Sequence, residues 1–177
     1  MKPQPGPAVI VVMGPAGAGK TTVGRALADA LGRHFYDADD FHDPANVARM
    51  RRGEALTDAD RAPWLAALSG VIAREIGDAS RGGPGAVLAC SALRRAYREA
   101  LMPRSAPPGA VRFVYLRAGP GTLEARLSTR RGHFAPPALL ASQLATLEEP
   151  DTSEHALVVD AEQSVDRVVA EVRRRLA

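Results

Sequence analysis

The residues that most clearly could bind a ligand or take part in a reaction form a glycine-rich segment near the start of the chain. The segment GPAGAGKT, residues 14–21, matches the pattern G-x-x-x-x-G-K-[ST] at every fixed position. Its glycines let successive backbone N–H groups turn toward phosphate oxygens, and the helix expected to begin near Lys20 directs its positive end at the same anion. Lys20 can reach the outer phosphates, and the Thr21 hydroxyl is placed to bind Mg²⁺. The segment therefore predicts nucleoside triphosphate binding. The alternative is a glycine-rich turn that only precedes a helix.

A second polar segment, DADDFH at residues 37–42, follows a short predicted strand. Ligands of parallel sheets bind at the carboxyl ends of the strands, so these carboxylates are expected to face the glycine-rich segment. A carboxylate there can orient an acceptor hydroxyl and take its proton, or hold magnesium through water. A solvated acidic turn is the alternative.

Two further segments carry arginines of uncertain role. Residues 56–65, LTDADRAPWL, offer Arg61 as a ligand for an anion, but a surface arginine is the commoner outcome, and Trp64 can equally belong to the core. Arg126, Arg130, Arg131 and His133 cluster at the end of a predicted helix and in the loop after it. Such a loop could close over a triphosphate, or it could be a solvated basic helix end.

The spacing of apolar residues predicts the elements that must position these groups. Short runs rich in β-branched residues predict strands, and apolar positions at helical spacing predict helices. Ser91 and Ser164 are expected to cap two of the helices, and an N-cap at Asp60 would place Pro63 in the first turn of a third, where its missing N–H costs nothing. The strands are expected at 8–13, 34–37, 86–90, 111–116 and 156–160, and the helices at 20–31, 44–51, 60–77, 92–101, 120–129, 138–147 and 165–176. This alternation predicts a parallel sheet with helices on both faces.

Composition narrows the class of protein. The chain has 177 residues and a net charge of +3, from 23 basic and 20 acidic residues, which is too balanced to indicate nucleic-acid binding. Only Lys2 and Lys20 are lysines, so the lysine of the glycine-rich segment stands out. A single cysteine, Cys90, excludes an intramolecular disulfide and is expected to be an inert core thiol. No apolar run is long enough to span a bilayer, and we expect a cytoplasmic protein without a membrane partner.

The sequence resembles the bacterial-type gluconokinases, small P-loop kinases related to shikimate and nucleoside monophosphate kinases. The matching segments span about residues 9–165. They are VVMGPAGAGKTTVGRALA, FYDADDFHDPANVARMRRGEALTDADRAPWL, LACSALRRAYREAL, VYLRAGPGTLEARLSTRRGHF, and SQLATLEEP followed by ALVVDAEQSV. The resemblance implies an α/β P-loop NTPase fold with a five-stranded parallel sheet of order 2-3-1-4-5 and a lid segment. It also implies one kinase domain over 1–177, with the lid at about 126–142 and a substrate-binding helical segment at about 40–65.

The same resemblance implies ATP-dependent phosphorylation of the terminal hydroxyl of D-gluconate, with Mg²⁺, in a protein expected to be a homodimer. Lys20, Asp39 and Arg130 are then the catalytic candidates, with Arg130 in the lid. Asp39 would orient and deprotonate the acceptor hydroxyl, while Thr21 and Asp37, the latter through water, would hold the metal. The candidate ATP-binding residues are Gly14, Ala16, Gly17, Ala18, Gly19, Lys20, Thr21, Thr22 and Arg126, and the candidate substrate-binding residues are Asp39, His42, Arg49, Arg61 and Arg94.

Two departures from the family and two rival functions accompany this interpretation. Related gluconokinases commonly carry serine at the positions of Ala16 and Ala18, and the strand ending near Cys90 offers no acidic residue for the metal. The nearest rival is another small-molecule kinase such as a shikimate kinase, although this chain has Ala89-Cys90-Ser91-Ala92 where those enzymes have a glycine-rich turn. The other rival is a non-catalytic nucleotide-binding regulator.

Overall fold

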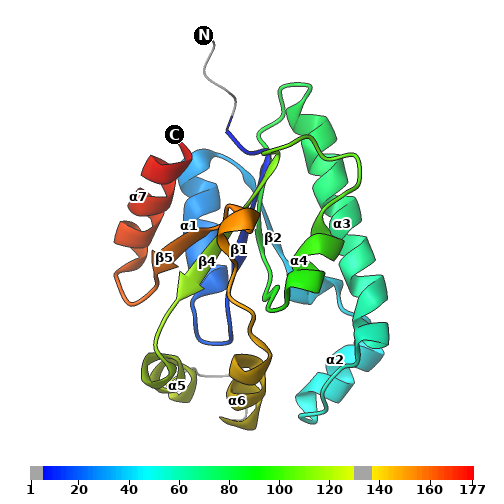
Figure 1. Ribbon diagram of the computed structural model, residues 1–177, viewed down its shortest axis with the longest axis vertical. Helices are drawn as coiled ribbons and strands as arrows, with labels where there is room; N and C mark the ends of the chain where they lie inside the picture. The colour runs from blue at the N-terminus through cyan, green and yellow to red at the C-terminus, as the bar shows by residue number, and fades with distance from the viewer. Residues whose placement is uncertain (1–5, 130–136) are drawn as a thin grey trace.

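The computed structural model describes residues 6–129 and 137–177. Its five strands form one parallel sheet in the order β2-β3-β1-β4-β5, as predicted (Figure 1). The strands are β1 (Val9–Met13), β2 (His34–Asp37), β3 (Ala86–Ala89), β4 (Val111–Arg117) and β5 (Leu157–Asp160). The helices are α1 (Lys20–Leu31), α2 (Pro44–Arg51), α3 (Asp58–Ala79), α4 (Arg95–Leu101), α5 (Pro120–Ser128), α6 (Pro137–Thr146) and α7 (Val165–Leu176), with short 3₁₀ helices η1 (Ala38–Phe41) and η2 (Thr152–Glu154).

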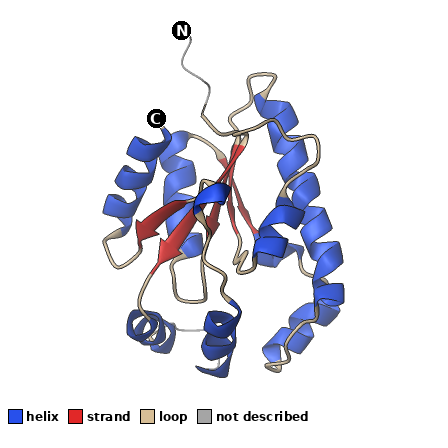
Figure 2. Cartoon of the chain, in the orientation of Figure 1, coloured by secondary structure: helices blue, strands red, loops and turns tan. Residues whose placement is uncertain are grey.

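Helices cover both faces of the sheet, with α1 and α7 on one face and α3 and α4 on the other (Figure 2). The central strand β1 is completely buried because its side chains alternate between the two layers. Ile10 and Val12 join the core under α1 and α7, whereas Val9, Val11 and Met13 join the core under α3. A strand that is buried on both faces has a continuous run of apolar residues. The run VIVVM therefore allowed β1 to be predicted from the sequence.

The sheet brings the polar segments to one end of the molecule. All strands are parallel, so the segments that follow β1, β2 and β3 leave the sheet at the same edge. Figure 1 shows α2, α5 and α6 at that end and the C-terminus of the chain at the opposite end. The fold therefore places the glycine-rich segment and the acidic segment at one edge.

The starts of two helices differ from the prediction. Helix α3 begins at Asp58, because Thr57 is its N-cap and Asp60 completes a capping box from the third helical position. Pro63 lies inside the helix and cannot donate to the carbonyl four residues earlier. Helix α4 begins only at Arg95, with Arg94 at the N-cap, because Ala92 adopts a left-handed conformation with φ of 44° that interrupts the chain after Ser91.

The predicted Ser164 cap is confirmed, since its hydroxyl accepts a hydrogen bond from the Arg167 amide at the start of α7. Over the residues that the structure describes, no helix combines the length and apolar character needed to cross a membrane.

Candidate active site

The glycine-rich segment folds as a tight loop between β1 and α1. Gly14, Gly17 and Gly19 all have positive φ angles, between 83° and 146°, which glycine adopts without strain. A Cβ atom on Gly17 would lie 2.8 Å from the carbonyl oxygen of Leu123, so the loop also needs glycine for its close packing against α5. Ala18 is 1% exposed, and its side chain packs into the hydrophobic core, which anchors this part of the loop.

The loop leaves the amino end of α1 open toward the expected phosphates. Gly19 is the N-cap of α1 and offers no side chain to cap the free amides, and Lys20, Thr21 and Thr22 form the first turn without an acidic residue. The ammonium group of Lys20 donates to the carbonyl oxygen of Pro15 at 3.0 Å, which folds this side chain back over the loop. Backbone amides and a cation therefore converge on one volume, the arrangement required for a polyphosphate.

The acidic segment meets this loop directly. The Thr21 hydroxyl donates a 2.8 Å hydrogen bond to Oδ2 of Asp37, and Oδ1 of the same carboxylate accepts from the Asp39 amide at 3.1 Å. A hydroxyl and a carboxylate so close together are hard oxygen donors that fit Mg²⁺. Among the described residues no group of three or more His, Cys, Asp or Glu side chains could hold a metal ion.

Cys90 lies buried between these two segments, at the end of β3. Burial raises the pKa of its thiol to about 12; the Asp39 and Asp37 carboxylates act weakly in the same direction, and the Lys20 ammonium acts weakly against it. The thiol is therefore protonated and inert at neutral pH, as expected from the sequence.

His42 lies against the tryptophan of α3. The imidazole stacks on the Trp64 ring with centroids 4.4 Å apart and planes within 7°, and the indole N–H donates to the Ala38 carbonyl at 2.7 Å. Nδ1 of His42 is buried and has no hydrogen-bond partner among the described residues. Burial lowers the pKa of His42, with Asp39 acting to raise it and Arg61 to lower it. It borders two depressions of about 490 and 530 Å³, and Asp39 lines the first.

Two of the predicted substrate-binding arginines come together around one tyrosine. The guanidinium carbons of Arg61 and Arg94 lie 5.5 and 5.6 Å from the centre of the Tyr97 ring. Asp58 contacts all three side chains, and its shortest bond is the 2.6 Å hydrogen bond donated by the Tyr97 hydroxyl. Sequence reasoning named Arg61 and Arg94 separately and missed Tyr97 and Asp58, because the grouping depends on the packing of α3 against α4.

Arg49, by contrast, is not part of this group. Its guanidinium pairs with Asp60 at 2.9 Å and with Glu54 at 3.4 Å, and these contacts join α2 to the start of α3. Arg49 therefore supports the helical segment between residues 40 and 65.

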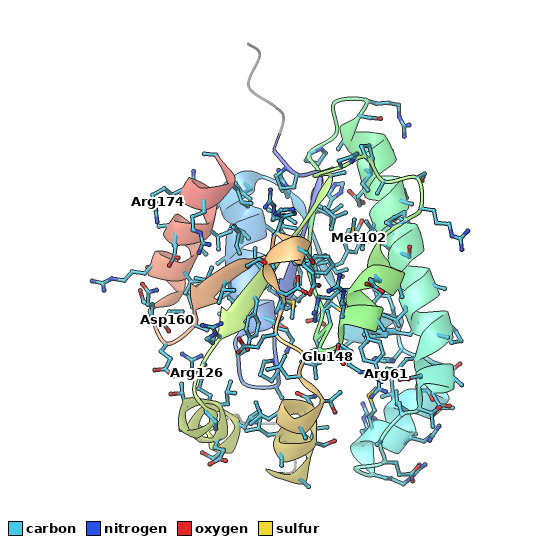
Figure 3. The ribbon with its side chains drawn as sticks, viewed as in Figure 1. Arg61, Met102, Arg126, Glu148, Asp160 and Arg174 are labelled. Carbon is cyan, nitrogen blue, oxygen red and sulfur yellow. The ribbon has the colours of Figure 1, made fainter. Side chains whose placement is uncertain are left out.

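Arg126 lies on the other side of the site from Arg61 (Figure 3). Its guanidinium donates to the Ala161 carbonyl at 2.7 Å, beside the loop that joins β5 to α7. Glu162 in that loop accepts hydrogen bonds from the Gly119 amide and the Thr122 hydroxyl, both at 2.9 Å, and so holds the start of α5. Arg130, the predicted lid arginine, lies outside the described residues, as do Arg131 and His133.

Helix α6 contributes a contact that the sequence did not predict. Oε1 of Gln143 accepts a 2.7 Å hydrogen bond from the amide of Ala16, inside the glycine-rich loop. Just beyond α6, the Glu148 amide donates to the Leu93 carbonyl at 2.8 Å, and its carboxylate lies 3.6 Å from Arg94. The segment 143–148 therefore touches both the loop and the arginine group. In the sequence, the only sign of this contact was a polar residue, Gln143, on the mostly apolar helix α6.

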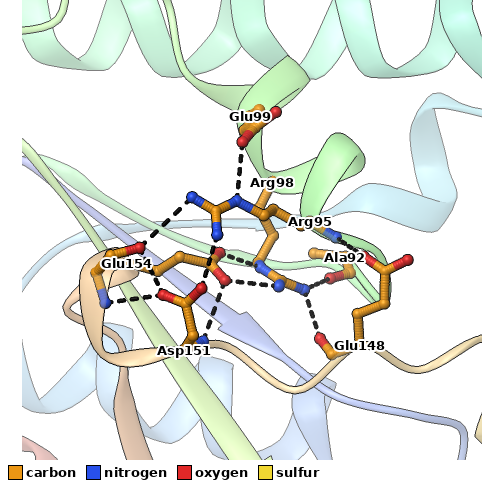
Figure 4. Close-up of polar contacts among 8 residues, drawn as sticks. Ala92, Arg95, Arg98, Glu99, Glu148, Asp151 and Glu154 are labelled. Carbon is orange, nitrogen blue, oxygen red and sulfur yellow. Dashed lines mark hydrogen bonds and ion pairs between the residues drawn. The ribbon is translucent and has the colours of Figure 1, made fainter.

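A buried arginine fixes the chain between β3 and α4 (Figure 4). Arg98 is 2% exposed, pairs with Glu154 through two nitrogens, and donates to the carbonyl oxygens of Ala92 and Glu148, each at 3.0 Å. A buried guanidinium is stable only when its donors are satisfied, as they are here. The network holds the left-handed turn at Ala92 and hence the position of Arg94 beside α3.

Known proteins share both this sequence and this architecture. A family model described as an AAA domain matches residues 9–150. The gluconokinase of Gluconobacter oxydans is 47% identical over 168 residues, which cover 95% of this chain and 90% of that protein. A crystal structure of a gluconokinase from Sinorhizobium meliloti is 41% identical with a TM-score of 0.79, and covers 96% of this chain and 94% of its own.

An unliganded sugar kinase from Janibacter is 40% identical with a TM-score of 0.84, and covers 98% of this chain and 96% of its own. These matches extend over nearly the whole chain. The chain therefore belongs to the gluconokinase family of P-loop kinases.

Proposed function

We propose that this chain is a gluconokinase that transfers the γ-phosphoryl group of ATP to the terminal hydroxyl of D-gluconate, giving 6-phospho-D-gluconate and ADP. One observation carries the proposal beyond family membership. The 2.8 Å bond between Thr21 and Asp37 brings the phosphate-binding loop and the acidic segment into contact. A phosphoryl donor bound to the first would meet an acceptor hydroxyl bound to the second.

In this proposal the loop residues from Gly14 to Thr22 hold the triphosphate, and Lys20 balances charge on its outer phosphates. Thr21 and Asp37, the latter through water, hold the Mg²⁺, which supplies further charge neutralisation when it is bound with ATP. Arg126 lies beside the nucleotide on the β5 side, and Arg130 belongs to the lid at about 126–142.

The acceptor is held by the segment at about 40–65 and by Arg94. Asp39 orients the terminal hydroxyl of gluconate and receives its proton as the new O–P bond forms and the bond to ADP breaks. His42 contacts the hydroxyls, while Arg61 and Arg94 hold the carboxylate, for which guanidinium groups are well suited. Arg49 was a candidate for the same role, but its pairs with Asp60 and Glu54 favour a supporting one.

The unit that performs this reaction is a single kinase domain over residues 1–177. We also propose a cytoplasmic location, where ATP is available, and a homodimer, which light scattering on the purified protein would test.

An acceptor comparison tests the function. Purified protein is supplied with ATP, Mg²⁺ and either D-gluconate, shikimate or a nucleoside monophosphate, and ADP release is followed with a coupled assay. We expect turnover with gluconate and none above background with the others. Turnover with shikimate but none with gluconate would assign the chain to the rival kinase activity. DNA binding without any turnover would favour a regulator.

A further inference from the structure

The group formed by Arg61, Arg94 and Tyr97 already holds a carboxylate, that of Asp58. Its two oxygens are bound separately: Oδ1 accepts from the Tyr97 hydroxyl at 2.6 Å and lies 3.9 Å from Arg61, whereas Oδ2 accepts from Arg94 at 3.2 Å. The Tyr97 ring lies near both guanidinium groups and fixes their separation. The three side chains thus have the geometry of a receptor for one carboxylate.

Asp58 is held loosely enough to leave. Its side chain is 67% exposed, and exposed ion pairs contribute little to stability because water solvates the separated charges well. Asp58 is the first residue of α3, whose N-cap is formed by Thr57 with Asp60. The helix start does not depend on the contacts that Asp58 makes with the arginines. The bonds from Tyr97 and the charges of Arg94 and Arg61 lower the pKa of Asp58, so its carboxylate is ionised at neutral pH.

The receptor also lies beside the candidate acceptor pocket. Arg61 directly follows Asp60, which lines one depression together with His42, and His42 also borders the depression that Asp39 lines. In an open-chain sugar acid the carboxylate and the terminal hydroxyl are at opposite ends of the molecule. An acid whose terminal hydroxyl reaches Asp39 would extend its carboxylate along His42 toward Arg61.

We propose that Asp58 occupies the substrate-carboxylate receptor in the ligand-free protein, and that the carboxylate of the sugar acid displaces it, with Tyr97 as a further residue that determines specificity for acids. The proposal deepens the gluconokinase assignment and rests on it for the identity of the acid. The internal carboxylate lowers the apparent affinity for substrate, because only the fraction of molecules with a vacated receptor can bind.

The test measures gluconate binding by calorimetry with a non-hydrolysable ATP analogue present. Asp58→Asn keeps the size of the side chain and removes its charge, and it is expected to lower the Kd for gluconate by about three- to ten-fold with an unchanged Kd for the analogue. The matched control is Asp78→Asn near the other end of the same helix, where Asp78 pairs with Arg81. This control should change neither constant. An unchanged or higher Kd for gluconate in Asp58→Asn would overturn the proposal.

A double variant separates displacement from a general charge effect. In an Arg94→Ala background the gain from Asp58→Asn should largely disappear, because the two side chains act in one receptor. If the full gain persists, the effect of Asp58 is long-range electrostatics and the receptor is wrong. Tyr97→Phe should weaken discrimination between gluconate and D-glucitol, its neutral analogue, while melting at the temperature of the wild type.

Acetate probes the receptor without requiring gluconate to be the substrate. In isotope-labelled protein, acetate should shift the side-chain N–H signals of Arg61 and Arg94, and it should do so at a lower concentration in Asp58→Asn. Wild-type protein that responds to acetate in this way but fails to phosphorylate gluconate would refute the gluconokinase assignment and leave the receptor intact. Unresponsive arginine signals in both proteins would refute the receptor.

Discussion

The hydroxyl of Thr21, on the first turn of α1, donates a 2.8 Å hydrogen bond to the carboxylate of Asp37 at the end of β2. Helix α1 follows β1, and β1 and β2 are not adjacent in the sheet, because β3 lies between them. The contact therefore brings the phosphate-binding loop and the acidic segment at residues 37–42 together at one site.

Replacement of the only lysine in the loop should remove most of the activity. Lys20→Ala takes a positive charge away from the phosphates, and we expect kcat to fall about a hundred- to a thousand-fold. Steady-state kinetics with thermal unfolding as the folding control measures this. A variant that melts normally and keeps more than half of the wild-type kcat would show that Lys20 does not contact the transferred group.

The acceptor-side acid should affect the rate and spare nucleotide binding. Asp39→Asn keeps the shape of the side chain but cannot take a proton, so kcat should fall at least about a hundredfold while the KM for ATP changes less than about twofold. Asp29→Asn, on the exposed side of α1, is the matched control and should behave as wild type. If Asp39→Asn instead raises the KM for ATP and leaves kcat alone, Asp39 belongs to the nucleotide site.

Gln143 should support the shape of the phosphate-binding loop. Its bond to the Ala16 amide is one neutral hydrogen bond, so Gln143→Ala should weaken ATP binding by about two- to ten-fold. Gln143→Glu restores an acceptor oxygen but places a negative charge beside the phosphates, and it should weaken binding further. Titration with an ATP analogue measures the order wild type, alanine, glutamate. A glutamate variant that binds as tightly as wild type would contradict it.

The single thiol should be unreactive in the folded protein. Burial raises the pKa of Cys90 to about 12, so iodoacetamide at about pH 8 should label it only when denaturant is present. Mass spectrometry of native and unfolded samples gives the comparison. Rapid labelling of the native protein would mean that the end of β3 opens to solvent.

The stability of the fold should depend on His42 in acid. Burial lowers the pKa of His42, so the unfolded chain takes up a proton at a higher pH than the folded protein does. The free energy of unfolding should therefore decline as the pH drops below about 6.5, and His42→Gln should lose less stability than wild type between about pH 7.5 and about pH 5.5. Urea unfolding at several pH values measures both curves, and equal losses would contradict the assignment.

Local patterns were sufficient for most of the fold. The fully buried run in β1 and the helical spacing in α1 fixed those elements, because both patterns arise within a few consecutive residues. The predicted start of α3 was wrong. The rule that proline avoids helix interiors was given more weight than the capping box formed by Thr57 and Asp60. The predicted start of α4 was also wrong. The turn at Ala92 is held by a hydrogen bond from Arg98, which lies six residues later, and a local sequence pattern does not reveal this contact.

The site was only partly accessible to the same reasoning. The loop and the acidic segment were identified because each is contiguous in sequence. Arg61 and Arg94 were named as separate candidates, but their common partners Tyr97 and Asp58 follow from how α3 packs against α4. No spacing rule relates Gln143 to Ala16, which are 127 residues apart.

The most direct test of the central claim is the identity of the phosphorylated product. The purified protein is incubated with ATP, Mg²⁺ and D-gluconate, and phosphorus NMR with mass spectrometry follows the γ-phosphate. The account predicts one phosphomonoester on the terminal hydroxyl of gluconate for each ADP formed. Release of inorganic phosphate with unmodified gluconate, or no consumption of ATP at all, would contradict it.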